Sequence, residues 1–257
     1  MIIHSYPKIN IGLNILNKRE DGYHNIETIF YPIFLFTDTL SISPFKNGIK
    51  FSTRGKYHVP DDSSNLCLKA VNLLRTDYRF IDNFVLELNK NIPIGAGLGG
   101  GSSNAAATLK LLNQYFELQL SEQDLIILAA KLGSDVPFFI KSSPSLGTGR
   151  GEILEPITLD LKNKKISIIE TDIHISTAEA YANCEPKMPT TSLKEAIKLP
   201  IVEWKNQIIN QFEKPIFSKF PVLATIKDEL YRLGADYVSL TGSGSAIYAI
   251  GDQRYEL

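Results

Sequence analysis

The segment from Asn91 to Leu109, N-I-P-I-G-A-G-L-G-G-G-S-S-N-A-A-A-T-L, constrains this chain more than any other. Five glycines stand within the seven positions from Gly95 to Gly101, and a run that favours helix follows from Asn104. Glycine allows backbone conformations with positive φ and lets a ligand approach main-chain N–H groups without a Cβ in the way. A glycine loop that opens a helix also directs free N–H groups and the positive end of the helix dipole at one point. The segment therefore predicts a phosphate-binding loop.

Two other interpretations of the glycines are weaker, and a Walker A motif is excluded because no G-K-S or G-K-T closes the loop. Gly95, Gly97 and Gly100 match G-x-G-x-x-G, but the dinucleotide motif needs a strand directly before its first glycine. Here the six residues N-K-N-I-P-I separate the predicted strand Phe84–Leu88 from the glycines. A glycine-rich turn without a ligand also stays open, although so many glycines carry an entropic cost that a plain turn does not need.

Charge and composition narrow the class of partner. The chain has 257 residues and a formal net charge of −1, with 27 Lys and Arg against 28 Asp and Glu. This balanced charge lacks the excess of basic residues that is typical of proteins that bind nucleic acid or an anionic membrane. The N-terminus lacks the features of a signal peptide, and no apolar run approaches the roughly 18–20 residues of a spanning helix. We therefore expect a cytoplasmic protein without a nucleic-acid or membrane partner.

The cysteines and histidines give no metal motif. Cys67 and Cys184 stand far apart, and the four histidines form neither H-x-x-H nor H-E-x-x-H. We expect buried thiols in a reducing compartment and no metal held wholly by protein side chains.

Hydrophobic patterning predicts an α+β chain with a strand-rich N-terminal half and a helix-rich C-terminal half, joined near residues 150–160. The predicted strands are Ile9–Leu16, Ile26–Phe36, Thr39–Ser43, Ile49–Thr53, Phe84–Leu88, Ile166–Ile169 and a hairpin of Tyr237–Leu240 with Ala246–Ile250. The predicted helices are Leu66–Leu74, one from Ser102 or Ser103 to Tyr115, one from Ser121 to Leu132, Ser192–Ile197, Trp204–Phe212 and Pro221–Leu233. Pro137 and the aromatic residues after it predict a strand over Phe138–Ile140, followed by a loop over Ser142–Gly151.

Three further motifs are ordinary when each is taken alone. Lys8, in P-K-I-N, heads the first predicted strand and has the position of a solvated edge lysine. Asp135, in G-S-D-V-P, has the position of a turn residue after a helix. The small-residue run Thr241–Ser245 has the position of a hairpin turn.

Together with the glycine loop, these motifs occur in the order found in GHMP kinases, and the chain resembles that superfamily from about Tyr6 to Ile250. The run R-E-D-G-Y-H at Arg19–His24 narrows the resemblance to members whose acceptor alcohol is linked to cytidine diphosphate. The resemblance implies a two-domain fold. Residues 1–155 would form the N-terminal ATP-binding domain and residues 156–257 the C-terminal domain, with the active site in the cleft between them. The implied activity is ATP-dependent phosphorylation of a hydroxyl group on a cytidine diphosphate-linked polyol, in isoprenoid precursor biosynthesis.

The resemblance also assigns roles to individual residues. Lys8 and Asp135 match the family's catalytic lysine and aspartate. The positions that match the nucleotide site are Asn65, Leu66, Lys90, Pro93, Gly95, Ala96, Gly97, Leu98, Gly99, Gly100, Gly101, Ser102, Ser103 and Asn104. The positions that match the cytidine substrate site are Asn10, Tyr23, His24, Asp135, Thr177, Tyr181, Thr241 and Gly242. Within that set, Tyr23 and Tyr181 are expected to sandwich the base and His24 to bind its edge.

The co-substrate implied is ATP, with Mg²⁺ as its counterion. Because no aspartate or glutamate lies inside the glycine loop, we expect the metal to be held mainly by the nucleotide and water. Two alternatives stay open. One keeps the fold and takes mevalonate, homoserine or a sugar as acceptor, against which Gly22-Tyr23-His24 argues. The other is a catalytically silent nucleotide-binding protein, against which the pair of Lys8 and Asp135 argues.

Overall fold

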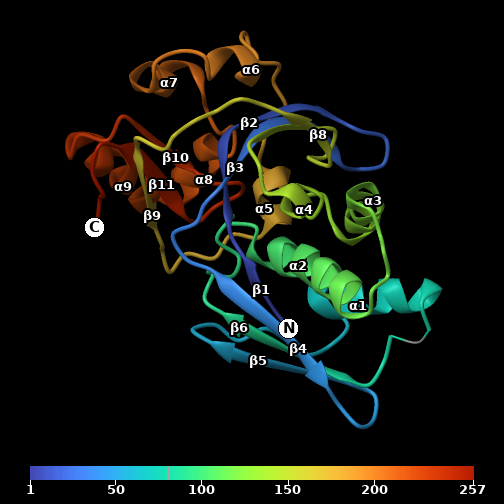
Figure 1. The fold of residues 1–257 in the computed structure, drawn as a ribbon. Coiled ribbons are helices and arrows are strands. Elements are labelled where there is room, and N and C mark those ends of the chain that lie inside the picture. The colour runs from blue at the N-terminus through green and yellow to red at the C-terminus, as the bar shows by residue number, and fades with distance from the viewer. Residues whose placement is uncertain (80) are drawn as a thin grey trace. The chain divides into compact units, whose positions relative to one another are not determined.

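The computed structural model describes residues 1–79 and 81–257, which form two compact units. The first unit comprises Met1–Lys8, Pro32–Ile94 and Gly99–Ser143, and the second comprises Ile9–Tyr31, Gly95–Leu98 and Pro144–Leu257. The glycine loop therefore contributes residues to both units. Strands dominate the N-terminal half and helices the C-terminal half, as the patterning predicts (Figure 1).

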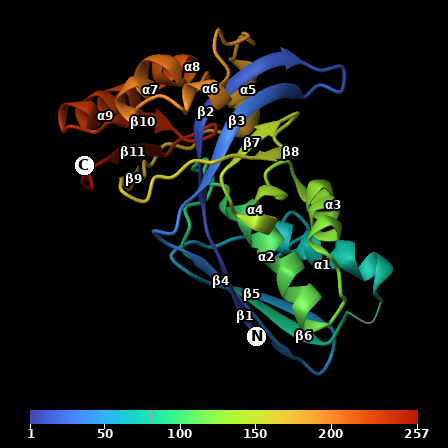
Figure 2. The same cartoon turned by 45° about the horizontal axis from the view of Figure 1, so that its top comes forward.

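The first unit is a sheet covered by helices. Its four strands have the order β1 (Ile2–Ser5), β4 (Asp38–Pro44), β6 (Phe84–Lys90) and β5 (Ile49–Gly55). β4 pairs antiparallel with β1 and β6, whereas β5 runs parallel to β6. Helix α2 (Gly100–Tyr115) packs on β1 and β4, and α1 (Leu66–Asp77), α3 (Glu122–Leu132) and α4 (Phe138–Lys141) each pack against α2 (Figure 2).

Local signals set most helix ends in this unit. Asn65 caps α1, and Ser121 with Asp124 forms the capping box that begins α3. The predicted serine start of α2 is wrong, because α2 begins at Gly100 with Gly99 at its N-cap. The predicted strand over Phe138–Ile140 is also wrong. Pro137 adopts φ −56°, which suits the start of a helix, and α4 follows it.

The second unit holds two sheets. One has the order β2 (Lys8–Lys18), β3 (His24–Pro32), β7 (Ser145–Thr148) and β8 (Ile153–Pro156). Lys8 and Pro32, at the ends of β2 and β3, belong to the first unit. The other sheet has the antiparallel order β10 (Tyr237–Leu240), β11 (Ile247–Gly251) and β9 (Lys165–Ile169).

Helices make up much of the rest of this unit. They are α5 (Thr177–Ala182), α6 (Leu193–Ala196), α7 (Ile201–Gln207), α8 (Glu213–Lys219) and α9 (Pro221–Arg232). α9 packs on β10 and β11, and α8 packs on α9. Leu223 and Leu230 of α9 join Val238, Leu240 and Ile247 of the sheet in one buried apolar cluster. This cluster fixes the hairpin that carries the small-residue turn between β10 and β11.

Three further predictions in the second unit and at its border are corrected. The predicted loop Ser142–Gly151 contains β7, which pairs with β3. The predicted strand Ile26–Phe36 ends at Pro32. The predicted helix Trp204–Phe212 runs instead over Ile201–Gln207, because Pro200 favours an earlier start and Ile209 accepts a hydrogen bond from the backbone of Leu13. Within the described residues, no helix combines the length and the apolar character needed to cross a membrane.

Candidate functional site

The glycine loop alternates in both conformation and exposure. Gly95, Gly97 and Gly99 have φ values of 69°, 75° and 69°, in the left-handed region that favours glycine. Between them, Ala96 and Leu98 are buried. A left-handed glycine at every second position therefore alternates with buried apolar side chains, and Gly95 is exposed whereas Gly97 and Gly99 are half-buried. This arrangement explains why the loop needs several glycines rather than one.

The second unit holds the first half of the loop on the turn after β10. The hydroxyl of Thr241 donates to the carbonyl of Gly97 at 3.1 Å, and Ala246 N–H donates to the carbonyl of Ala96 at 3.3 Å. A Cβ on Gly97 would overlap the backbone carbonyl of Thr241. The close approach of these two backbones is therefore possible only with glycine at position 97.

The first unit presents the second half of the loop as the start of α2. The first intrahelical hydrogen bond runs from Ser103 N–H to the carbonyl of Gly99 at 2.9 Å. The N–H groups of Gly100, Gly101 and Ser102 accordingly have no acceptor within the helix, and no side chain caps this end of α2. An uncapped end of a 16-residue helix, reached through glycines, is suited to bind an anion.

Lys8 and Asp135 meet next to this helix end, within the first unit. Lys8 Nζ lies 3.5 Å from Asp135 Oδ2, and Lys8 is buried whereas the Asp135 side chain is 34% exposed. A Cβ on Gly99 would lie 3.0 Å from Lys8 Cε, so the lysine runs directly beside the loop. Burial lowers the pKa of Lys8, and the charge of Asp135 opposes that shift. The structure thus brings together the two residues predicted to be catalytic and sets them against the loop.

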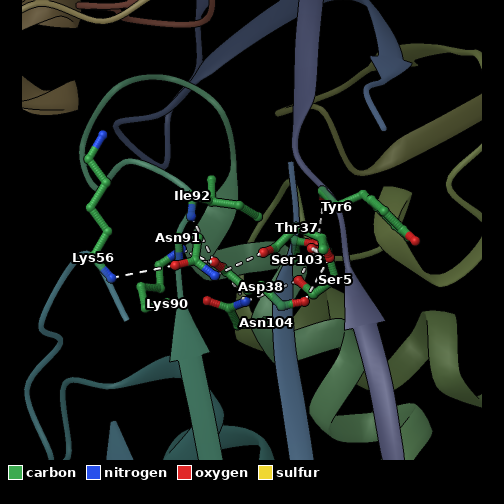
Figure 3. Close-up of polar contacts among 10 residues, drawn as sticks. All are labelled: Ser5, Tyr6, Thr37, Asp38, Lys56, Lys90, Asn91, Ile92, Ser103 and Asn104. Carbon is green, nitrogen blue, oxygen red and sulfur yellow. Dashed lines mark hydrogen bonds and ion pairs between the residues drawn. The ribbon is translucent and has the colours of Figure 1, made fainter. Parts of the chain in front are cut away.

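Three residues predicted to contact the nucleotide point into the interior of the first unit. Lys90 pairs with Asp38 at 2.5 Å, and Asn104 donates to the same carboxylate at 2.8 Å. The hydroxyl of Ser103 donates to the carbonyl of Tyr6 at 2.7 Å (Figure 3). All three are buried beneath the loop, and their role as nucleotide contacts stays a prediction. Asp38 is absent from the predicted site, because an aspartate that opens a strand gives no signal of a partner 52 positions later.

Asn65 and Leu66 lie at the start of α1, close to the exposed Gly101. Asn65 Oδ1 accepts from Cys67 N–H at 2.8 Å, and its Nδ2 donates to the carbonyl of Pro60 at 2.6 Å. Leu66 Cδ1 would lie 3.7 Å from a Cβ on Gly101. Of the two predicted nucleotide positions, Leu66 therefore lies beside the loop in the first unit, whereas Asn65 is buried and caps α1.

The second unit pairs His24 with Tyr181. Their rings stack with centroids 4.9 Å apart and planes 15° apart, and Tyr181 meets Phe212 edge-on. Burial is the main cause that lowers the pKa of His24, so its imidazole is neutral at neutral pH. Tyr23 is 56% exposed and faces the guanidinium of Arg150, with 4.9 Å between Cζ and the ring centroid. Tyr181 thus lies against His24, and the predicted sandwich of a base between Tyr23 and Tyr181 stays a prediction.

A second group of predicted substrate residues meets in the interior of this unit. Asn10 N–H donates to Thr241 Oγ1 at 3.2 Å, and Asn10 Nδ2 donates to Thr28 Oγ1 at 2.9 Å. A Cβ on Gly242 would lie 3.3 Å from Asn10 Oδ1. Asn10, Thr241 and Gly242 therefore share one location. Thr177 is exposed, with its hydroxyl 3.4 Å from that of Ser243 on the same turn.

Asn210 and Glu213 support this turn and are absent from the predicted site. Asn210 Nδ2 donates to the carbonyls of Leu240 and Gly242 at 2.9 and 2.8 Å. Glu213 Oε1 accepts from Leu240 N–H at 2.9 Å and from the hydroxyl of Ser239 at 3.0 Å. Asn210 falls within the predicted helix Trp204–Phe212, and that error hid its role. Glu213 follows that range as the first residue of α8.

Acidic, histidine and cysteine side chains do not gather into a metal site in the part of the chain that the structure describes, in groups of three or more. The donor groups at the loop are backbone N–H groups and hydroxyls, which suit an anion rather than a cation.

Comparisons with known proteins place the chain in a family. The model of the GHMP kinases N terminal domain matches residues 65–143, and the model of the GHMP kinases C terminal matches residues 193–256. The two matches fall inside the predicted ranges 1–155 and 156–257, and the boundary between those ranges stays a prediction.

Individual relatives extend the match to nearly the whole chain. A 4-diphosphocytidyl-2-C-methyl-D-erythritol kinase from Bacteroides thetaiotaomicron is 48% identical over 97% of this chain and 92% of its own length. The crystal structure of a 4-(cytidine 5'-diphospho)-2C-methyl-D-erythritol kinase has a TM-score of 0.81 and 31% identity, and the match covers 98% of this chain and 90% of that one.

A homoserine kinase from Cytophaga hutchinsonii shares the fold alone. Its structure has a TM-score of 0.74 at 15% identity, over 98% of this chain and 85% of that one. On these family-model matches and the 48% identity to a curated relative, the chain belongs to the GHMP kinases, within the family of the 4-diphosphocytidyl-2-C-methyl-D-erythritol kinases.

Proposed function

We propose that this chain transfers the γ-phosphoryl group of ATP to the 2-hydroxyl of 4-diphosphocytidyl-2-C-methyl-D-erythritol, in non-mevalonate isoprenoid precursor biosynthesis. The observation that carries the proposal is the pair of Lys8 and Asp135 beside the uncapped start of α2. A buried ammonium, an accessible carboxylate and a set of free backbone N–H groups are the parts that phosphoryl transfer to an alcohol requires.

The glycine loop is the proposed binding site of the β- and γ-phosphates of ATP. The N–H groups of Gly100, Gly101 and Ser102 at the start of α2 would donate to phosphate oxygens, and the helix dipole would favour their negative charge. The exposed backbone at Gly95 would continue this surface. Mg²⁺ would neutralise phosphate charge from a position on the nucleotide and water, in keeping with a loop that offers hydroxyls and N–H groups but no carboxylate.

Asp135 is the proposed base for the acceptor. Its carboxylate would orient the 2-hydroxyl and take its proton as the oxygen bonds to the γ-phosphorus and ADP departs. Lys8, 3.5 Å away, would pair with the carboxylate and counter the negative charge that develops on the transferring group. Lys8 can act on both the Asp135 carboxylate and the transferring phosphoryl group, because it lies against Asp135 on one side and Gly99 on the other.

The second unit carries the proposed contacts to the acceptor. Tyr181 and His24 already stack, and a cytosine ring placed on Tyr181 would extend or replace that stack. The neutral imidazole of His24 offers one donor and one acceptor for the cytosine edge. Asn10, Thr177, Thr241 and Gly242 would hold the rest of the acceptor.

We also propose that the protein works in the cytoplasm as a monomer or weak homodimer, on small molecules and without nucleic acid or membrane. The support is the net charge of −1, which attracts neither polyanions nor an anionic surface. Sedimentation of the purified chain across a range of concentrations tests the oligomeric state.

The test of the activity is ADP release by the purified chain with Mg²⁺ and ATP, with 4-diphosphocytidyl-2-C-methyl-D-erythritol, mevalonate or homoserine as acceptor. We expect ADP release only with the cytidine compound, and its loss in Asp135→Ala. Release with another acceptor would keep the nucleotide site and overturn the substrate. ATP binding without release to any acceptor would favour a silent nucleotide-binding protein.

A further inference from the structure

One buried carboxylate beneath the glycine loop has no part in the chemistry described so far. Asp38 is fully buried at the start of β4 in the first unit. Its side chain accepts hydrogen bonds from residues that stand far apart in the sequence, and Figure 3 shows these donors converging on it. Burying a carboxylate costs free energy unless its oxygens accept hydrogen bonds or pair with a cation. The partners of Asp38 therefore indicate what its side chain does in the fold.

The contacts of Asp38 join β4 to the segment that enters the loop. Oδ1 accepts from Asn91 N–H at 2.6 Å and from Ile92 N–H at 2.7 Å. These two residues directly follow β6 and precede Pro93, so the carboxylate fixes the backbone where the chain leaves the sheet. Hydrogen bonds to a charged acceptor are shorter and stronger than neutral ones, and both distances agree with that class.

The other oxygen joins β4 to the helix that the loop opens. Oδ2 accepts from Lys90 Nζ at 2.5 Å and from Asn104 Nδ2 at 2.8 Å. Asn104 lies near the start of α2 and also donates to the hydroxyl of Ser5 at 3.0 Å, which in turn donates to that of Ser103 at 2.7 Å. One side chain therefore ties down both the entrance of the glycine loop and the first turns of α2.

Lys90 is held under the loop by this carboxylate. It is 1% exposed, and a Cβ on Gly100 would lie 2.9 Å from its Nζ. The ammonium thus supports the first residue of α2 from below. Asp38 satisfies this charge and opposes the lowering of the Lys90 pKa that burial causes.

We propose that Asp38 is a positioning residue for nucleotide binding, and that Lys90 and Asn104 act through it, from beneath the loop, rather than by touching the nucleotide. The inference rests on the proposed function, since it assigns these residues to the same nucleotide site. Asp38 sets the geometry of the N–H groups at Gly100–Ser102 and leaves the acceptor residues of the second unit untouched.

The test compares Asp38→Asn with Asp38→Asn/Lys90→Met. Asparagine keeps an oxygen for Asn91 and Ile92 but turns an NH₂ toward the Lys90 ammonium and the Asn104 amide. The added Lys90→Met change removes the ammonium that Asp38→Asn leaves unpaired. The double variant therefore shows the effect on the loop conformation without the destabilisation caused by a buried unpaired charge. For each variant the melting temperature, the hydrogen exchange of residues 91–103 and the KM of each substrate are measured.

We expect the double variant to regain melting temperature relative to Asp38→Asn, while residues 91–103 still exchange faster than in the wild type. Its KM for ATP should stay raised by about tenfold or more, the scale of a lost hydrogen bond to a charged group, and its KM for the acceptor should change by about threefold at most. A double variant with wild-type KM for ATP and wild-type exchange would reduce the pair to a purely structural role. Equal rises in both KM values would also overturn the proposal.

A control variant outside the loop and a second variant at the buried pair complete the test. Asp236→Asn breaks the part-buried pair with Lys164, 2.7 Å long, outside the loop, and should lower the melting temperature without changing the KM for ATP. If Asp38→Asn does not fold, Lys90→Met alone serves, because Asp38 keeps three of its four donors. Its KM for ATP should then rise above the wild-type value while its KM for the acceptor stays close to wild type, and a wild-type KM for ATP would overturn the proposal. Hydrogen exchange needs no activity, so an inactive wild type would overturn the proposed function while the exchange pattern still decides the role of Asp38 in the loop.

Discussion

Gly97 and Thr241 are in backbone contact, although 144 positions separate them in the sequence. The Thr241 hydroxyl donates to the Gly97 carbonyl, and the Thr241 carbonyl fills the space that a side chain on Gly97 would need. The small-residue turn after β10 is thus the surface on which the first half of the glycine loop rests. Close packing against Gly97 is therefore one reason for small residues in this turn.

This contact predicts that Gly97→Ala is harmful for two reasons. Alanine is strained at φ +75°, and its Cβ would push the Thr241 backbone away. We expect a loss of about 1–3 kcal/mol in the free energy of unfolding and weaker ATP binding. The matched control is Gly101→Ala, where φ is not positive and the new Cβ would meet only Leu66 at 3.7 Å. Denaturant titration of both variants checks this, and equal stability losses would contradict the packing argument.

Lys8→Ala and Asp135→Ala should each lower kcat by about a hundredfold or more while the fold is kept. The lysine variant loses the cation beside the loop, and the aspartate variant loses the group that we propose orients the acceptor hydroxyl. Steady-state kinetics with circular dichroism on each variant provides the measurement. Lys141→Ala removes an exposed lysine that pairs with Glu122 in the same unit, and it should keep wild-type kcat. Near-native turnover in folded Asp135→Ala would remove the aspartate from its proposed role.

Tyr181→Ala should raise the KM of the cytidine substrate more than that of ATP. The tyrosine stacks on His24, and the loss of one aromatic stack costs about 1–3 kcal/mol by analogy with nucleic-acid sites. Tyr181→Phe keeps the ring and should keep the KM of both substrates close to wild type. Measuring the KM of ATP and of the cytidine substrate in the two variants tests whether the Tyr181 ring binds the base. If Tyr181→Ala raises the two KM values equally, the ring has no specific part in binding the base.

The acceptor affinity should weaken at acidic pH through His24. Because burial lowers the pKa of His24 below the ordinary value of 6.5, the neutral imidazole persists to a lower pH than in an exposed histidine. As pH falls through that lowered pKa, the ring gains a proton and loses its acceptor nitrogen. We therefore expect kcat/KM for the acceptor to fall only below pH 6.5, and this limb to be absent from His24→Gln. An acid limb at or above the ordinary pKa, or one that persists in the variant, would exclude His24 as its source.

Local patterns in the sequence sufficed for much of the fold. The capping signals at Asn65 and at Ser121 with Asp124 set helix starts correctly, and alternation located β6 and the hairpin of β10 and β11. The predictions of secondary structure were wrong where contacts with a distant segment decide the backbone conformation. Ser145–Thr148 becomes a strand because β3 offers it an edge, and Asn210 leaves the helical path because its amide binds the turn after β10.

The sequence by itself determined the family resemblance, the prediction of a phosphate-binding loop and the choice of Lys8 and Asp135 as candidates for catalysis. These follow from residue types at short spacing, which fix backbone freedom and charge locally. Only the tertiary structure decided that Lys90 and Asn104 turn inward to Asp38, that Tyr181 lies on His24, and that Asn210 supports the Thr241 turn. Such contacts join residues far apart in the chain, and buried polar side chains need hydrogen-bond partners that no local pattern records.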